Sequence, residues 1–178
     1  MGTPNGNHSL LLVDRKSHLT KGRGDSIHLA LHLAAVLILG LMCGSELNVA
    51  AFAHPTLNRQ TRQVHIPMRA SLASLLGQVM PFWMGGSTLL NLLLLLRVMN
   101  LRNSAWTLAA IASAIQVFAV VFSLVGPVPI NNRIKKWTVE TLPGNWAAEE
   151  RRWDTFHWLR TCALVVAFAL LALSLANR

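Results

Sequence analysis

The order of apolar and polar positions divides the chain into four long apolar stretches separated by polar segments. These stretches cover about residues 27–53, 70–97, 105–125 and 156–176. Each approaches or exceeds the roughly 20 mainly apolar residues that a helix needs to cross a bilayer. None of them alternates apolar and polar residues as a membrane strand would. The pattern therefore predicts an all-α integral membrane protein, a four-helix bundle with polar connections.

The polar segments are expected to connect these helices. Residues 54–69 form the first predicted loop and residues 97–104 a short second loop. The third, residues 126–154, is long and holds three of the six tryptophans. Long connections with many special residues are usually functional or disordered. The tryptophans favour an ordered loop between helices three and four, either as an interfacial aromatic belt or as a lid over a pocket.

Composition agrees with a membrane protein and sets the domain division. Apolar residues make up 53% of the 178 residues and charged residues only 13%, and the mean hydropathy is +0.43. Residues 1–26 read as a polar, basic N-terminal tail and residues 27–178 as the transmembrane domain. The net charge is +9, but the basic residues flank uncharged stretches and form no single patch. We therefore expect the lipid bilayer as a partner and no nucleic acid.

The orientation in the membrane depends on the basic residues of the connections, which are almost equally divided between the two sides. Cytoplasmic loops carry an excess of Lys and Arg. The basic residues of the third connection are partly neutralised by nearby acids, namely Glu140, Glu149, Glu150 and Asp154. This weak asymmetry predicts four spans with both termini in the cytoplasm.

A few polar residues fall within the predicted spans, where they are costly and are functional candidates by default. Helix one ends, helix two begins, helix three ends and helix four begins on the same side of the membrane. Glu46, Gln78, His157 and Arg160 should therefore lie at one level. One interpretation is that these four residues line a pocket. The alternative is that Glu46 and Arg160 form a buried ion pair with only a structural role.

Metal binding is a further alternative at this level. Glu46, His54 and His157 form a set of two histidines and one carboxylate, which suits non-haem iron or copper. The chain contains no G-x-G-x-x-G motif for a dinucleotide and no C-x-x-C-H motif for haem. The cofactor is therefore expected to be either a non-haem iron or copper ion, or none beyond O2.

The third connection and the fourth helix contain the most specific motif. It begins with 127–134, PVPINNRI, followed by Trp137, Trp146, Arg152-Trp153 and the segment 157–160, HWLR. Helix one adds 44–46, GSE, with His54-Pro55, and helix two adds 80–84, MPFWM. Together these resemble the anthrone oxygenase family of small four-helix membrane proteins, over about residues 28–177.

The resemblance implies a membrane-embedded, monooxygenase-like oxidoreductase of secondary metabolism. Its substrate would be a hydrophobic small molecule of the aromatic or polyketide type, oxidised with O2. A base must remove a proton, and donors must hold the developing oxyanion in a dry pocket. Glu46 or His157 would be the base. The oxyanion donors would be Arg160, Arg133, Asn131 and Asn132. The substrate would be bound by Gln78, Trp137, Trp146 and Trp153.

Two other classes of function remain open. One is metal-dependent C–H oxidation of another small molecule. The other is a non-enzymatic transporter or membrane subunit, although the halves of the chain show no repeat of the kind that transporters contain. Association of identical copies is also expected, through the small residues Gly85, Gly86 and Ser87.

Overall fold

The computed structural model describes residues 6–98 and 103–177, and the side chains discussed below lie between residues 26 and 177. The described chain is helical and contains no strand. Its four long helices are α1 (Gly6–Asn48), α3 (Arg62–Val98), α4 (Ser104–Val125) and α6 (Trp146–Ala176). The short elements are η1, a π-helix (Val49–Ala53), α2 (His54–Leu57) and α5 (Pro127–Ile134). The predicted all-α class is confirmed.

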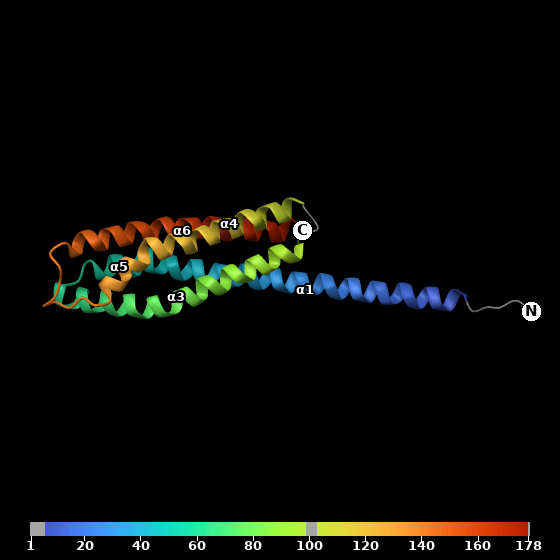
Figure 1. The fold of residues 1–178 in the computed structure, drawn as a ribbon, viewed down its shortest axis with the longest axis horizontal. Helices are drawn as coiled ribbons and strands as arrows, with labels where there is room; N and C mark the ends of the chain where they lie inside the picture. Colours follow the sequence, from blue (N-terminus) through green and yellow to red (C-terminus); the bar gives the residue numbers. More distant parts are fainter. Residues whose placement is uncertain (1–5, 99–102, 178) are drawn as a thin grey trace, which may run out of the picture.

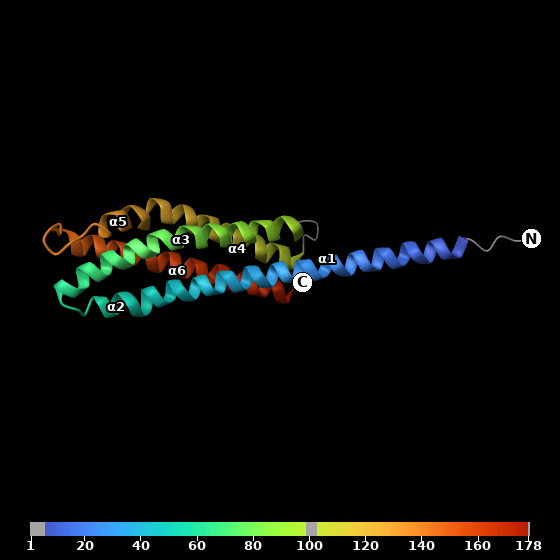
Figure 2. The same ribbon diagram turned by 90° about the horizontal axis from the view of Figure 1, so that it is seen from below.

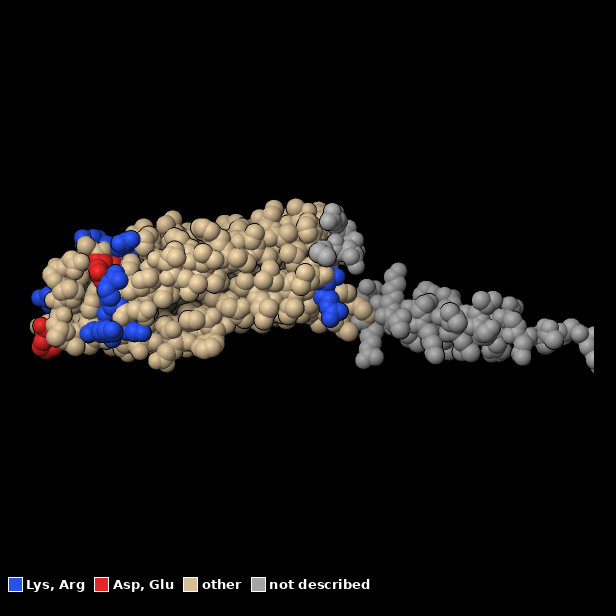
Figure 3. Space-filling model, in the orientation of Figure 1, with Lys and Arg blue, Asp and Glu red and all other residues tan. Residues whose placement is uncertain are grey.

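Among the described residues, four helical segments are long and apolar enough to cross a membrane. They are Ser26–Leu57, Arg62–Arg97, Ser104–Val125 and Trp146–Ala176. Figures 1 and 2 show α2, α5 and the first turns of α3 and α6 at one end of the bundle, while α6 finishes at the other end. Figure 3 shows Lys and Arg at both ends of this face, Asp and Glu at one end, and no charged residue in the broad middle. The protein is thus an integral membrane four-helix bundle.

The connections are shorter than the sequence predicted. The first helix runs on to Leu57 and α3 begins at Arg62, so the proposed loop at 54–69 shrinks to four residues. Pro67 suggested a loop, but it lies near the start of α3, and Pro81 lies within the same helix. Such prolines are tolerated in membrane helices because neighbouring groups satisfy the freed backbone. Half of the predicted second connection, 97–104, lies outside the described residues, namely 99–102.

The third connection contains a helix that the sequence did not predict. Its prolines suggested a chain break, yet Pro127 is the first residue of α5, where its missing N–H has no intrahelical partner to lose. The fourth helix begins early, at Trp146. The irregular segment is therefore only residues 135–145.

The first spanning helix changes its winding just after Glu46. Residues Val49–Ala53 form a π-helical turn, and the N–H of His54 donates to the carbonyl of Val49, five residues earlier. Pro55 follows; it has no N–H, and in a regular α-helix its ring would clash with the carbonyl four residues earlier. Widening the turn avoids this clash. The local sequence thus accounts for a π-turn, a feature that often lies at functional sites.

Two apolar clusters hold the bundle together. The larger fills the middle between α1, α3, α4 and α6 and is rich in small residues, including Ala35, Ala109, Ala112, Ala119 and Ala167. Small residues let membrane helices approach closely. The second cluster lies at the end that carries α5, where Ile130, Ile134 and Trp137 pack with residues such as Ile66 and Trp153. The second cluster fixes α5 and the following segment onto the bundle.

Candidate functional site

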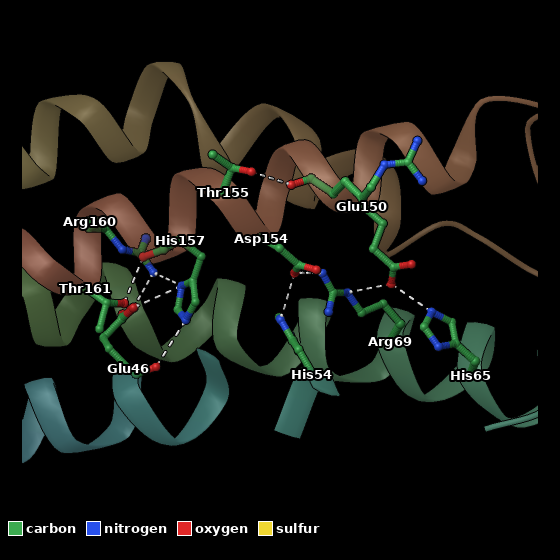
Figure 4. Close-up of polar contacts among 11 residues, drawn as sticks. Glu46, His54, His65, Arg69, Glu150, Asp154, Thr155, His157, Arg160 and Thr161 are labelled. Atoms are coloured by element: carbon green, nitrogen blue, oxygen red, sulfur yellow. Dashed lines mark hydrogen bonds and ion pairs between the residues drawn. The ribbon is translucent and has the colours of Figure 1, made fainter. Parts of the chain in front are cut away.

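Three ionisable side chains from α1 and α6 meet inside the bundle, and we call Glu46, His157 and Arg160 the inner cluster. Nη2 of Arg160 donates to Oε2 of Glu46 at 2.6 Å, and Nη1 donates to Oγ of Ser123 at 3.2 Å. Glu46 is 1% exposed, His157 2% and Arg160 8%. A buried charge of this kind needs a partner, and the expected convergence of these three residues is what the structure shows (Figure 4).

The contacts of His157 identify its neutral tautomer. Nε2 lies 3.2 Å from the backbone carbonyl of Glu46. Because a carbonyl oxygen only accepts, Nε2 carries the proton and donates it. Nδ1 then accepts from Nη2 of Arg160, 3.0 Å away. Both ring nitrogens are therefore engaged within the protein.

Several polar atoms of this region have no hydrogen-bond partner among the described residues. They are Oε1 of Glu46, Nε of Arg160 and Nε1 of Trp153. Buried polar atoms are nearly always paired, so each such atom calls for an explanation. The set contains one acceptor and two donors. These atoms are therefore candidates for accepting a proton from a bound molecule or donating hydrogen bonds to it.

A second polar network, which we call the outer cluster, lies nearer the end of the bundle that carries α2. It consists of His54, His65, Arg69, Glu150 and Asp154, drawn in Figure 4. Nη2 of Arg69 donates to Oδ1 of Asp154 at 2.6 Å, and Nε of Arg69 lies 3.3 Å from Oε1 of Glu150. Nδ1 of His54 donates to the same Asp154 oxygen at 3.1 Å. The network links α2, α3 and α6.

His65 completes the outer cluster from α3. Its Nε2 lies 2.7 Å from Oε1 of Glu150, and its Nδ1 lies 2.8 Å from the carbonyl of Leu57. The second contact ties the start of α3 to the last residue of α2. The turn between these helices is thereby held by a buried side chain.

Trp153 separates the two clusters. Its ring stacks on His157 with centroids 4.7 Å apart and planes at 16°, and His54 approaches it at the same centroid distance but at a tilt of 58°. The guanidinium carbon of Arg69 lies 4.9 Å from its ring centroid. These contacts make Trp153 a rigid part of the wall between the clusters.

A cavity of about 210 Å³ lies against the inner cluster. Its polar wall is formed by Glu46, Ser123, His157 and Arg160, with Trp153 beside them. The opposite wall comes from α3, α4 and α5 and is mainly apolar, with members such as Met80, Pro81, Met84, Leu124 and Val128. Mostly apolar cavities with a few convergent polar groups are typical ligand sites.

The Asn-Asn-Arg segment of α5 divides between cavity and surface. Asn131 and Asn132 line the cavity, and Nδ2 of Asn131 also donates to the carbonyl of Ala73 at 2.8 Å. Arg133 does not line it: its side chain is 51% exposed and pairs with Glu149 at 3.0 Å. Successive residues of a helix point about 100° apart, so three in a row cannot all face one cavity.

Three of the expected substrate-binding residues lie away from the cavity. Gln78 is exposed on α3 and is the residue that follows Gly77, which lines the cavity. Trp137 packs into the second apolar cluster. Trp146 lies beside His65, 5.9 Å between centroids, because it precedes Trp153 by two turns, about 10 Å along α6. Of the four residues proposed to bind substrate, only Trp153 lines the cavity.

The expected metal set is divided between the clusters. Glu46 and His157 belong to the inner cluster, whereas Nδ1 of His54 bonds to Asp154 in the outer one. Within residues 6–98 and 103–177, no group of three or more His, Cys, Asp or Glu side chains is placed to hold a metal ion. The two-histidine, one-carboxylate arrangement is therefore not formed.

The outer cluster was missed in the sequence because its members were assigned to loops. A signal was present: His65 and Arg69 are four residues apart, and so are Glu150 and Asp154. That spacing places each pair on one helix face. It becomes visible only once α3 and α6 are known to begin early.

The small residues expected to mediate association are also divided. Ser87 is buried, at 2% exposure, and donates to Oε1 of Gln116 at 3.5 Å. Gly85 and Gly86 are exposed, and Gly85 lines the cavity. These residues therefore do not share one outer face.

A large part of the chain matches a known protein family. A sequence profile of the family described as anthrone oxygenase matches residues 71–170, which include α4, α5 and the cavity-lining parts of α3 and α6. Neither the curated proteins nor the solved structures compared with this chain give a match. The profile covers more than half of the sequence, and the chain belongs to the anthrone oxygenase family.

Proposed function

We propose that this protein is a membrane-embedded oxygenase that oxidises a hydrophobic, aromatic or polyketide-type small molecule with O2 in secondary metabolism. The observation that carries the proposal is the polar wall of the cavity. Its residues Glu46, Arg160 and Trp153 each carry a buried polar atom that has no hydrogen-bond partner among the described residues, inside an otherwise apolar bundle. The family name supports the reaction class.

Glu46 is the proposed base. An anthrone-like substrate has an acidic methylene group in a ring that also bears a carbonyl. Oε2 of Glu46 is bound to Arg160 and lies 3.2 Å from Nδ1 of His157, which leaves Oε1 to accept the proton. His157 uses both nitrogens within the protein, so its proposed role is to orient Glu46 and Arg160.

The oxyanion that forms on the ring carbonyl needs donors that are already in place. Nε of Arg160 and Nε1 of Trp153 lack partners among the described residues, and Asn132 adds an amide to the wall. Donors in a water-poor site stabilise charge more strongly than they would in water. These groups are therefore the proposed oxyanion site.

The proposed reaction replaces CH2 by C=O and consumes one O2. Glu46 takes one methylene proton, and the electron pair stays on the ring and its carbonyl oxygen. The carbanion reduces O2 and forms a C–O bond, and the resulting peroxide anion takes the proton back from Glu46. Loss of the second C–H proton breaks the O–O bond and expels hydroxide, giving the ketone and water.

The test uses the protein in lipid nanodiscs with anthrone as substrate. We expect anthraquinone formation and O2 uptake in equal amounts, with one atom of isotopically labelled O2 in the new carbonyl. His157→Ala should reduce turnover, because Glu46 and Arg160 lose the side chain that orients them, while the purified bundle stays helical by circular dichroism. Elemental analysis of the same preparation tests the metal alternative. Protein that leaves anthrone unchanged, or product without label, would contradict the proposal.

A further inference from the structure

The cavity has an opening on the side of the bundle, between α3 and the α4–α5 junction. Three of its lining residues on α3, namely Gly77, Pro81 and Gly85, are exposed. On α4 the lining residue Leu124 is 62% exposed. The inner cluster forms the opposite wall. The cavity therefore extends from the buried charges to the outer surface of the bundle.

This opening lies where the membrane is expected. Gly85 is 16 residues from Arg69 and 12 from Arg97 along α3, about 24 Å and 18 Å at 1.5 Å per residue. The α3 sequence between these arginines contains no charged residue. The neighbouring Phe82 is 83% exposed, as expected for a side chain in contact with acyl chains. The opening thus faces lipid.

The α3 side of the opening lacks bulky side chains. Gly77, Pro81 and Gly85 follow one another at intervals of four, so they share a helix face. A Cβ atom built on Gly85 would meet nothing within 4 Å. Pro81 also lacks the N–H that a regular residue would donate to the carbonyl of Gly77.

The cavity lining also includes two residues with unpaired buried groups. Oε1 of Glu46 and Nε of Arg160 have no hydrogen-bond partner among the described residues, and their side chains are 1% and 8% exposed. An apolar entrance that leads to such groups fits a molecule with a flat apolar body and one oxygen-bearing edge.

We propose that the substrate enters the cavity sideways from the lipid phase, through the opening bordered by Gly77, Pro81, Gly85 and Leu124. The ligand class is a neutral, polycyclic ketone or phenol that partitions into the bilayer. Its apolar rings pass α3, and its oxygen-bearing edge reaches Arg160 and Glu46. This inference rests on the proposed function for the identity of the ligand, but the entrance can be tested by binding alone.

Two adjacent glycines give a matched pair of variants. Neither Gly85 nor Gly86 has an atom within 4 Å of a built Cβ, and both are exposed, but only Gly85 lines the cavity. Gly85→Leu should narrow the entrance, whereas Gly86→Leu should place the same side chain in lipid. Gly85→Ala introduces a smaller side chain at the same position and should narrow the entrance less.

Binding is measured with radiolabelled anthraquinone and protein in nanodiscs, corrected for empty nanodiscs. We expect Gly85→Leu to weaken binding by about tenfold or more, the usual scale for a misfitted apolar group. Gly85→Ala should fall between this variant and wild type, and Gly86→Leu should stay within about twofold of wild type. Anthraquinone sulfonate, whose charge keeps it out of the lipid core, should compete poorly.

The outcomes separate the entrance from the reaction. Three results would overturn the proposed entrance. They are wild-type binding of anthraquinone by Gly85→Leu, equal losses of binding in Gly85→Leu and Gly86→Leu, and competition by anthraquinone sulfonate as strong as that by anthraquinone. If binding follows the expected pattern but anthrone is not oxidised, the entrance stands and the proposed function fails. If Gly85→Leu oxidises anthrone at the wild-type rate, the proposed function stands and the entrance fails.

Discussion

The ion pair between Glu46 and Arg160 lies in the bundle with almost no exposure on either side. Removing one member of a buried pair leaves an uncompensated charge, which usually costs about 3–5 kcal/mol. Replacing both members by neutral groups avoids this penalty. The pair is therefore expected to behave as a unit in stability measurements.

We predict that Glu46→Gln alone lowers the unfolding free energy in detergent by about 3 kcal/mol. The double variant Glu46→Gln with Arg160→Gln should recover most of this loss. Denaturant titration followed by circular dichroism measures both. Additive losses in the double variant would show that the two side chains do not interact.

Gly77 allows α5 to approach α3 closely. A Cβ atom at this position would lie 2.9 Å from Nδ2 of Asn131, which donates to the carbonyl of Ala73. Gly77→Ala should displace that amide and reduce anthraquinone binding to the same extent as Asn131→Ala. Because both changes remove one contact, combining them should add little, as a double-mutant cycle would show. Fully additive effects would contradict this contact.

The residues of the candidate site were only partly predictable. Glu46, His157 and Arg160 stood out because charged groups are rare within apolar stretches. Arg133 and Gln78 are equally polar, but their exposure depends on helix phase, which the predicted loop and helix limits did not define. Trp137 and Trp146 are of the right type for ring binding, yet they pack against other parts of the protein.

At the scale of elements, the π-turn at Val49–Ala53 governs which residues share a face. In a regular α-helix, the eight residues from Glu46 to His54 would rotate the chain by two turns and about 80°. The wider turn reduces this rotation and so brings the two residues closer to one face of the helix. Glu46 and His54 are both buried, and both contact α6.

Pro55→Ala should restore regular α-helical winding, because alanine supplies the missing N–H and has no ring. His54 would then rotate away from Asp154. The measurement is disulfide formation between His54→Cys and Asp154→Cys, with Cys43 and Cys162 replaced by Ala. Cross-linking should be efficient with Pro55 and weak with Pro55→Ala. Equal yields would show that Pro55 does not determine the winding.

At the scale of the whole molecule, the sequence was a good guide because membrane spans depend on long apolar runs. All four spans were expected, and all four are present. The helix ends were less predictable, since Pro55, Pro67 and Pro127 normally signal a break but are accommodated here within or at the start of helices. The polar turns of α3 and α6 were consequently assigned to loops.

The bundle predicts that the N-terminal segment and the connection after α4 lie on opposite sides of the membrane. A single cysteine at Ser26 should react with an impermeant maleimide from one side, and a single cysteine at Thr141 from the other. Both positions are exposed. Cys43 and Cys162 are replaced by Ala in this experiment. Reaction of both positions from the same side would contradict the four-span topology.

The proposed oxidation depends on the carboxylate of Glu46 as the base in the cavity. The most direct test compares anthrone turnover by Glu46→Gln and Glu149→Gln in nanodiscs, with anthraquinone binding as the check that each protein is folded. Glu149 makes an ion pair with the exposed Arg133, outside the cavity. We predict that Glu46→Gln binds anthraquinone but loses about a hundredfold or more in turnover, while Glu149→Gln matches wild type. Turnover by Glu46→Gln at the wild-type rate would contradict the proposed role of Glu46 as the base.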